Sequence, residues 1–229
     1  MVAFPMNQKA EGGAIKVALV EDHKMFREWL GNMIAMDDEF AVCGEADNIR
    51  DALIMIKEKQ PDIAIVDITL RGGSSGLELI KDLKALGSPL PVLVLSMHDD
   101  ELYAERVLRA GAKGYITKHE ASSTLVKAIR QVLSGQVYLG EKMTAAIIGK
   151  LTGHKSPSAT SGLESLADRE LEVFQLIGKG YNAREIAQQL RLGETTIDTY
   201  RARIKEKLHL RNAAELYSRA AQWLRDHGG

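Results

Sequence analysis

The most constraining feature of the sequence is an alternation, over residues 15–135, between short apolar runs and longer amphipathic stretches. Runs rich in Val, Ile and Leu are typical of parallel strands that are buried on both faces. The intervening stretches repeat apolar residues at helical spacing, as crossover helices do. The pattern therefore predicts an α/β domain with an open, doubly wound parallel sheet. Its five predicted strands are Lys16–Val20, Phe40–Ala46, Ile63–Val66, Val92–Leu95 and Gly114–Thr117.

Polar side chains follow or end four of the predicted strands. Glu21 and Asp22 come after the first strand, Asp67 after the third, Ser96 after the fourth and Lys118 after the fifth. In an open parallel sheet the carboxyl ends of the strands meet at one edge, where ligands bind. Any one of these side chains alone is explained as well by capping of a loop or helix. Polar residues at four equivalent positions favour a functional site.

Three carboxylates at one edge would repel one another and raise each other's pKa unless a cation lay among them. Mg²⁺, which prefers oxygen ligands and keeps several waters, suits such a group. Asp67 can then act as a nucleophile toward a phosphoryl donor, while the Lys118 ammonium pairs with a phosphoryl oxygen and Ser96 donates to another. The residues therefore predict an acyl phosphate on Asp67.

Neither a membrane segment nor a disulfide is expected. No apolar run approaches the roughly 18 residues that span a bilayer, and residues 1–13 lack the apolar stretch of a signal peptide. The single cysteine, Cys43, excludes an intramolecular disulfide and favours a buried structural thiol. We therefore expect a cytoplasmic protein without a membrane partner.

The pattern changes after residue 135. Residues 136–162 lose regular periodicity and include a stretch, 153–162, with the Gly, Ser and Pro content of a flexible linker. A short helix over Lys142–Leu151 is compatible with the apolar spacing there. We expect a tail over 1–14, a first domain over 15–135, a linker over 136–162 and a small all-α domain over 163–229.

Four helical stretches make up the second domain. Asn182 with Glu185, and Asn212 with Glu215, have the spacing of capping boxes. Helix Ala183–Leu190 is followed by a three-residue turn and then by Glu194–Leu208. This is the arrangement of a helix-turn-helix, in which the second helix enters the major groove of DNA.

Residues 194–208 carry the candidate DNA contacts. At about 100° per residue, Ile197, Tyr200, Ile204 and Leu208 share one side, small polar residues lie opposite, and cations flank them. Residues 165–229 hold 11 basic and 9 acidic side chains, against 19 and 22 in residues 1–164. This asymmetry is compatible with an anionic partner for the second domain, but a run of cations is more commonly a solvated helix face. The candidate contacts are Thr195, Thr196, Asp198, Thr199, Arg201, Ala202, Arg203, Lys205 and Lys207. The same periodicity also suits an amphipathic helix in a protein-interaction module.

Four segments resemble, in order and spacing, the receiver motifs of two-component response regulators: Val20–His23, Ile65–Leu70, Leu95–Met97 and Gly114–Lys118. The resemblance implies a flavodoxin-like fold in which Asp67 accepts phosphate from a sensor histidine kinase. It further implies that Glu21, Asp22, Asp67 and the Thr69 carbonyl hold Mg²⁺, that Ser96 and Lys118 contact the phosphoryl group, and that Ser96 and Tyr115 form the switch.

The second domain resembles the LuxR-type DNA-binding domain through residues 166–173, 185–187, 195–197 and 207–208. The whole chain therefore resembles a NarL/FixJ-type regulator. This implies a transcription factor that dimerises when phosphorylated and binds inverted half-sites in promoter DNA. Three positions depart from the family pattern: Ala167 replaces a capping Thr, Gly193 replaces a capping Ser, and Asp198 stands where many relatives carry Lys. The base preference of the family therefore does not carry over.

Three alternatives fit parts of the sequence. A Mg²⁺-dependent phosphohydrolase would also use Asp67 as a nucleophile, but such enzymes carry a second Asp two residues on, where this chain has Thr69. A nucleotide-binding flavodoxin-like domain would have a glycine-rich first loop, where this chain has residues 21–24, Glu-Asp-His-Lys. A protein-interaction adaptor would use the second domain for a partner other than DNA. We therefore expect no turnover of an external substrate.

Overall fold

The computed structural model describes residues 13–70, 75–97, 101–151 and 162–227. The chain divides into two compact units, residues 1–148 and 149–229. Most of the predicted N-terminal tail, and residues 152–161 of the predicted linker, lie outside the described residues. Among the described helices, none combines the length and the apolar character that crossing a bilayer requires.

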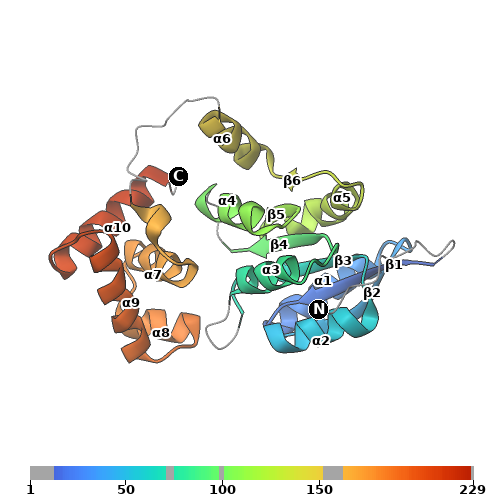
Figure 1. Ribbon diagram of the computed structural model, residues 1–229, viewed down its shortest axis with the longest axis horizontal. Helices are drawn as coiled ribbons and strands as arrows, with labels where there is room; N and C mark the ends of the chain where they lie inside the picture. The colour runs from blue at the N-terminus through green and yellow to red at the C-terminus, as the bar shows by residue number, and fades with distance from the viewer. Residues whose placement is uncertain (1–12, 71–74, 98–100, 152–161, 228–229) are drawn as a thin grey trace. The chain divides into compact units, whose positions relative to one another are not determined.

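The first unit is built on a parallel sheet with the strand order β2-β1-β3-β4-β5-β6 (Figure 1). The strands are β1 Ile15–Val20, β2 Phe40–Ala46, β3 Ile63–Asp67, β4 Val92–Ser96, β5 Gly114–Thr117 and β6 Tyr138–Leu139. The strand order reverses at β1, as in a doubly wound sheet. This confirms the predicted fold class and corrects the number of strands from five to six. Strand β6 pairs only two residues with β5, too few to produce a periodic signal in the sequence.

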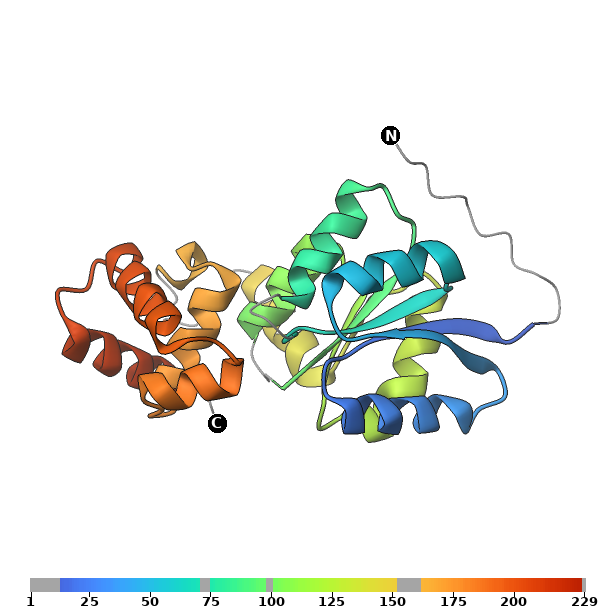
Figure 2. The same ribbon diagram turned by 90° about the horizontal axis from the view of Figure 1, so that it is seen from below.

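Helices cover both faces of this sheet, as Figure 2 shows. They are α1 Lys24–Ala35, α2 Ile49–Lys59, α3 Gly76–Ala85, α4 Glu101–Ala110 and α5 Ala121–Leu133, and α6 Glu141–Leu151 follows β6. Leu30 of α1 and Leu125 of α5 share one buried cluster with Val17, Leu19 and Ile65 of the strands. Helices α1 and α5 therefore cover one face, and α2, α3 and α4 cover the other (Figure 2).

The central strands β3 and β4 are buried along their whole length, which is why they consist almost entirely of Val, Ile, Leu and Ala. Their register places Asp67 beside Leu95 and Ser96 beside Thr117. The polar residues at the strand ends therefore lie at one edge of the sheet, as the sequence predicts.

The second unit is all α. After a 3₁₀ turn at Leu163–Ser165, its helices are α7 Asp168–Gly178, α8 Ala183–Leu190, α9 Glu194–Lys207 and α10 Ala213–His227. The rings of Phe174 and Trp223 meet edge to face, with centroids 6.2 Å apart. A Cβ on Gly178 would lie 2.6 Å from the Ala220 carbonyl oxygen, so a glycine is needed where α7 approaches α10. Helices α8 and α9, separated by a short turn, confirm the predicted helix-turn-helix.

Hydrogen bonds at the helix starts explain where these helices begin. The Asn182 side chain accepts from the Glu185 N–H, and the Glu185 carboxylate accepts from the Asn182 N–H, which is a complete capping box. At the start of α7 the capping box has only one of its two hydrogen bonds, because the methyl of Ala167 cannot accept one from the backbone. The Glu170 carboxylate still accepts from the Ala167 N–H at 2.7 Å.

Candidate functional site

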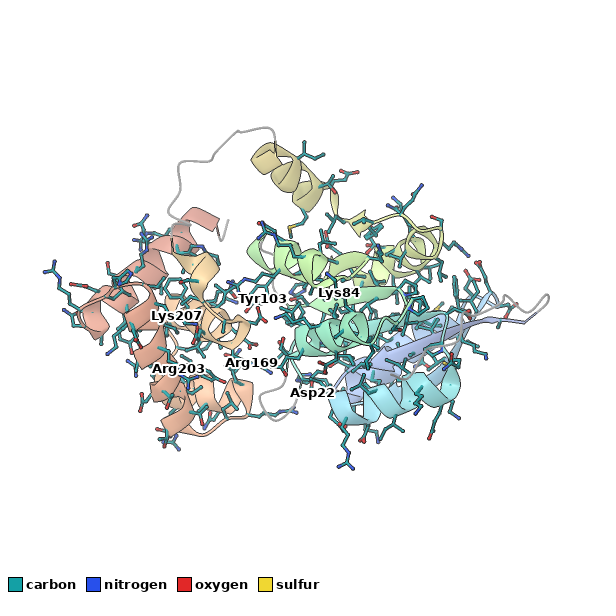
Figure 3. The ribbon with its side chains drawn as sticks, viewed as in Figure 1. Asp22, Lys84, Tyr103, Arg169, Arg203 and Lys207 are labelled. Carbon is teal, nitrogen blue, oxygen red and sulfur yellow. The ribbon has the colours of Figure 1, made fainter. Side chains whose placement is uncertain are left out.

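Three carboxylates converge at the carboxyl edge of the sheet. Glu21 and Asp22 follow β1, Asp67 ends β3, and all three are buried; Figure 3 labels Asp22. The pairing of β1 with β3 brings them together. His23 joins them, since its Nδ1 lies 2.8 Å from Asp22 Oδ1 and 3.1 Å from Glu21 Oε1. One ligand atom from each of these four residues lies within 4.8 Å of the others.

Lys118 enters the same site from the end of β5. Its Nζ donates to Glu21 Oε2 at 2.7 Å and to Asp67 Oδ2 at 2.8 Å, and its side chain is only 8% exposed. The ammonium also lies 4.5 Å from the centroid of the Phe26 ring, which stacks on Trp29. Lys118 therefore lies beside Asp67, whereas the sequence analysis expected it to pair with a phosphoryl oxygen. Phe26 adds a cation–π contact that the sequence analysis did not identify.

The two charges of this pair respond differently to burial. Burial, followed by repulsion from Glu21, raises the pKa of Asp67 to about 7, although Lys118 and the Thr69 N–H act in the opposite direction. Burial by itself would lower the pKa of Lys118, but attraction to Asp67 and Glu21 outweighs it and raises that pKa. The site therefore keeps a cationic lysine beside a carboxyl that titrates close to neutrality.

The remaining predicted residues of this site are placed by the strand ends. Ser96 is fully buried at the end of β4, and its carbonyl accepts from the Lys118 N–H at 2.7 Å. The Thr69 N–H donates to Asp67 Oδ1 at 3.3 Å. Tyr115 lies inside β5 and is buried, two residues before the sheet edge.

The donor set suits a hard divalent cation. Glu21, Asp22 and Asp67 carry three carboxylates, and Lys118 contacts two of them, those of Glu21 and Asp67. Carboxylate and carbonyl oxygens are the ligands of Mg²⁺, and a divalent charge would offset the excess of negative charge. His23 could have been recognised from the sequence, because it directly follows Asp22.

Helix α9 presents most of its predicted DNA-facing residues to solvent. Thr195, Thr196, Asp198, Thr199, Ala202 and Arg203 are exposed, while Lys205 is partly exposed. Ile197 and Ile204 are buried, which confirms the predicted core side of the helix. The surface available to a ligand is therefore the small, polar side that the periodicity predicts.

Two of the predicted flanking cations are engaged within the second unit. Arg201 donates to the Tyr217 hydroxyl of α10 at 2.7 Å and pairs with Asp198. Lys207, labelled with Arg203 in Figure 3, donates to the buried Glu170 of α7 at 2.6 Å. The sequence analysis missed Tyr217 and Glu170 as partners, because they lie 16 and 37 residues from their cations.

Comparisons with known proteins match both units of the chain. The response regulator receiver domain family matches residues 17–130, and the luxR family of bacterial regulatory proteins matches residues 164–220. The oxygen regulatory protein NreC of Staphylococcus carnosus is 33% identical over 205 residues, which cover 88% of this chain and 94% of NreC. The transcriptional regulatory protein DegU of Brevibacillus brevis is 30% identical over 223 residues, covering 92% and 94% of the two chains.

Solved structures show the same architecture. The response regulator ChrA of a heme-sensing two-component system is 28% identical, covers 92% of this chain and 98% of its own, and has a TM-score of 0.51. RcsB of Salmonella typhimurium, at 22% identity and a TM-score of 0.56, covers 91% of this chain and 98% of its own, and shares the fold. With the receiver motifs in the first unit and the LuxR-type helix-turn-helix in the second, the chain belongs to the two-component response regulators of the NarL/FixJ type.

Proposed function

We propose that the chain is a phosphorylation-controlled transcription factor in which Asp67 accepts a phosphoryl group from a sensor histidine kinase. The observation that carries this proposal is the Lys118 ammonium, held between Asp67 and Glu21 beside Asp22. This arrangement combines a carboxylate nucleophile, a cation beside it and oxygen donors for a metal.

In the proposed step, an Asp67 carboxylate oxygen forms a bond to the phosphorus of a phosphohistidine. The phosphorus–nitrogen bond of the donor breaks, and the departing imidazole takes up a proton. Lys118, already 2.8 Å from Asp67 Oδ2, would pair with a phosphoryl oxygen, and the Ser96 hydroxyl would donate to another. Positioning and charge stabilisation supply most of the catalysis in such a transfer.

Glu21, Asp22, Asp67 and the Thr69 carbonyl would hold Mg²⁺, which when bound neutralises charge on the phosphoryl oxygens. The donor chemistry of the three carboxylates supports this assignment. The chain is expected to turn over no external substrate, since the site serves to modify Asp67 itself.

The second unit is proposed to bind double-stranded promoter DNA through α9, as a homodimer on inverted half-sites when Asp67 is phosphorylated. The exposed polar side of α9 supports contact with base edges, and Arg203 and Lys205 would contact phosphates. Because the proposed partners are a kinase and chromosomal DNA, the proposed location is the cytoplasm, without a membrane partner.

A labelling experiment with acetyl phosphate tests the first unit. Asp67→Asn is expected to abolish labelling, because an amide cannot form the acyl phosphate. Lys118→Ala should remain folded but lose most of the increase in DNA affinity that phosphorylation causes, whereas Lys113→Ala, at an exposed lysine just before β5, should behave as wild type. Stoichiometric labelling of Asp67→Asn at another residue would overturn the assignment.

A protein-interaction adaptor is the second candidate function for the LuxR-type unit. A gel-shift assay of the full chain against genomic DNA fragments at moderate salt distinguishes an adaptor from a DNA-binding protein, because an adaptor would shift no fragment.

A further inference from the structure

We infer that Asp198 recognises a cytosine in the major groove and that a chain of contacts from Tyr217 through Arg201 holds its carboxylate in position. The inference rests on the proposed DNA binding by the second unit and adds the base that one position of α9 would select.

The contact chain joins α9 to α10. Arg201 Nη1 lies 3.3 Å from Asp198 Oδ1, and Nη2 of the same guanidinium donates to the Tyr217 hydroxyl at 2.7 Å. The guanidinium also lies over the Tyr217 ring, 5.4 Å from its centroid. The Arg201 side chain is 21% exposed and that of Asp198 is 65% exposed. The arginine therefore lies back against α10, while the carboxylate stands out on the helix surface.

An acidic residue on a DNA-facing helix has an electrostatic cost, because it is repelled by the phosphates. The adjacent Arg201 reduces this cost by supplying a positive charge on the side of Oδ1. A planar guanidinium that is hydrogen-bonded to one group and stacked on a ring loses little further freedom when it pairs with a carboxylate. Arg201 is therefore better placed to support Asp198 than to reach a phosphate.

A carboxylate can only accept hydrogen bonds, which restricts the base edges that it tolerates. Guanine and thymine present acceptors in the major groove, and adenine presents an acceptor beside its amino group. Cytosine presents the N4 amino donor, the partner that Asp and Glu side chains accept from. Asp198 is therefore expected to select cytosine at one position of each half-site.

Tyr217 has the role of a positioning residue. Its hydroxyl and ring hold the arginine on the α10 side of α9, and without the hydroxyl the guanidinium is free to turn toward a phosphate. Replacing Tyr217 with Phe keeps the ring and removes only the hydrogen bond. Loss of this hydrogen bond is expected to weaken the preference for cytosine at the position that Asp198 contacts. The preferences at the other positions of the DNA motif should change little.

The test is selection from a pool of random-sequence DNA duplexes by the full-length protein treated with acetyl phosphate and Mg²⁺. Wild type should enrich a motif with one strong cytosine per half-site. Asp198→Asn should move that position toward adenine by about tenfold, because an amide pairs with the N6 and N7 edge. Tyr217→Phe should lower the cytosine preference by about fivefold, the effect of one net hydrogen bond. Tyr181→Phe, an exposed tyrosine outside α9 and α10, is the matched control.

The outcomes separate this inference from the function on which it rests. A wild-type protein that enriches no sequence overturns both the proposed DNA binding and the inference. A wild-type motif that stays unchanged in Asp198→Asn overturns the inference and leaves the DNA-binding proposal standing. An altered motif in Asp198→Asn with an unchanged one in Tyr217→Phe overturns the positioning role of Tyr217.

Discussion

Asp67 is buried beside Glu21, and its pKa of about 7, raised first by that burial, implies that folding changes how tightly this carboxyl holds its proton. An unfolded aspartate titrates near pH 3.9. Because the folded chain holds the proton more tightly, the contribution of Asp67 to the free energy of unfolding falls as the pH rises from about 4 to about 7. The buried Asp67 carboxylate is therefore maintained at a cost in stability that begins above about pH 4 and is complete above neutral pH.

We predict that the free energy of unfolding of Asp67→Asn, relative to that of wild type, increases by on the order of 2 kcal/mol from pH 5 to pH 8. The reason is that the amide does not titrate, whereas the Asp67 carboxyl of wild type loses its proton over this range. Urea unfolding of both proteins in EDTA at the two pH values measures the difference. Asp38→Asn, at an exposed carboxyl, should show no such gain. A gain of the same size in both variants would contradict the assignment of the titration to Asp67.

Between helices of the second unit, an ion pair links α9 to α7 through Lys207 and Glu170. The Glu170 carboxylate is 4% exposed and accepts from the Lys207 ammonium as well as from the Ala167 N–H, whereas Lys207 is 38% exposed. Removal of the lysine would leave a buried carboxylate without its countercharge, although solvent at the Lys207 end limits the loss.

We predict that Lys207→Ala lowers the free energy of unfolding by about 1 kcal/mol. Arg203→Ala, at an exposed residue one turn earlier on α9, should change it by less than about 0.5 kcal/mol and should instead weaken binding to all DNA sequences alike. Urea unfolding and salt-dependent gel shifts measure the two effects. Equal stability of the two variants would refute a structural role for Lys207.

At the scale of the whole molecule, each of the two units has its own buried apolar side chains. In the second unit these include Phe174, Ile186, Ile197, Leu216 and Trp223. A chain divided in this way can keep its LuxR-type unit folded while the proposed phosphorylation changes the conformation of the receiver. Joining two such units in a dimer would raise the effective concentration of the second on DNA without new base contacts.

We therefore predict that residues 163–229 alone fold and bind duplex DNA at low salt without phosphorylation. The phosphorylated full chain should sediment as a dimer and protect inverted half-sites about one helical turn apart, with higher affinity than the fragment. Footprinting and sedimentation of both proteins provide the measurement. Failure of the fragment to bind any duplex at low salt would remove the transcription-factor proposal.

The doubly wound sheet, the acidic site and the helix-turn-helix can all be predicted from the order of the residues. These depend on short-range patterns: apolar runs that suit buried strands, apolar residues at helical spacing, and polar residues at the ends of strands. The rule that parallel strands end at one edge then brings Glu21, Asp22 and Asp67 together without knowledge of any side-chain contact. Helix α8, for example, has the same limits in the structure as in the prediction.

The pairing of charged side chains, in contrast, depends on how the folded chain brings distant residues together. Lys118 contacts Glu21 across 97 residues of chain, Lys207 contacts Glu170 across 37, and Arg201 contacts Tyr217 across 16. Periodicity describes neighbours within a few turns or strand residues, so it cannot say that cations predicted to face DNA instead stabilise their own domain. The same limit applies to β6, whose two residues acquire a strand conformation only because β5 offers them hydrogen-bonding partners.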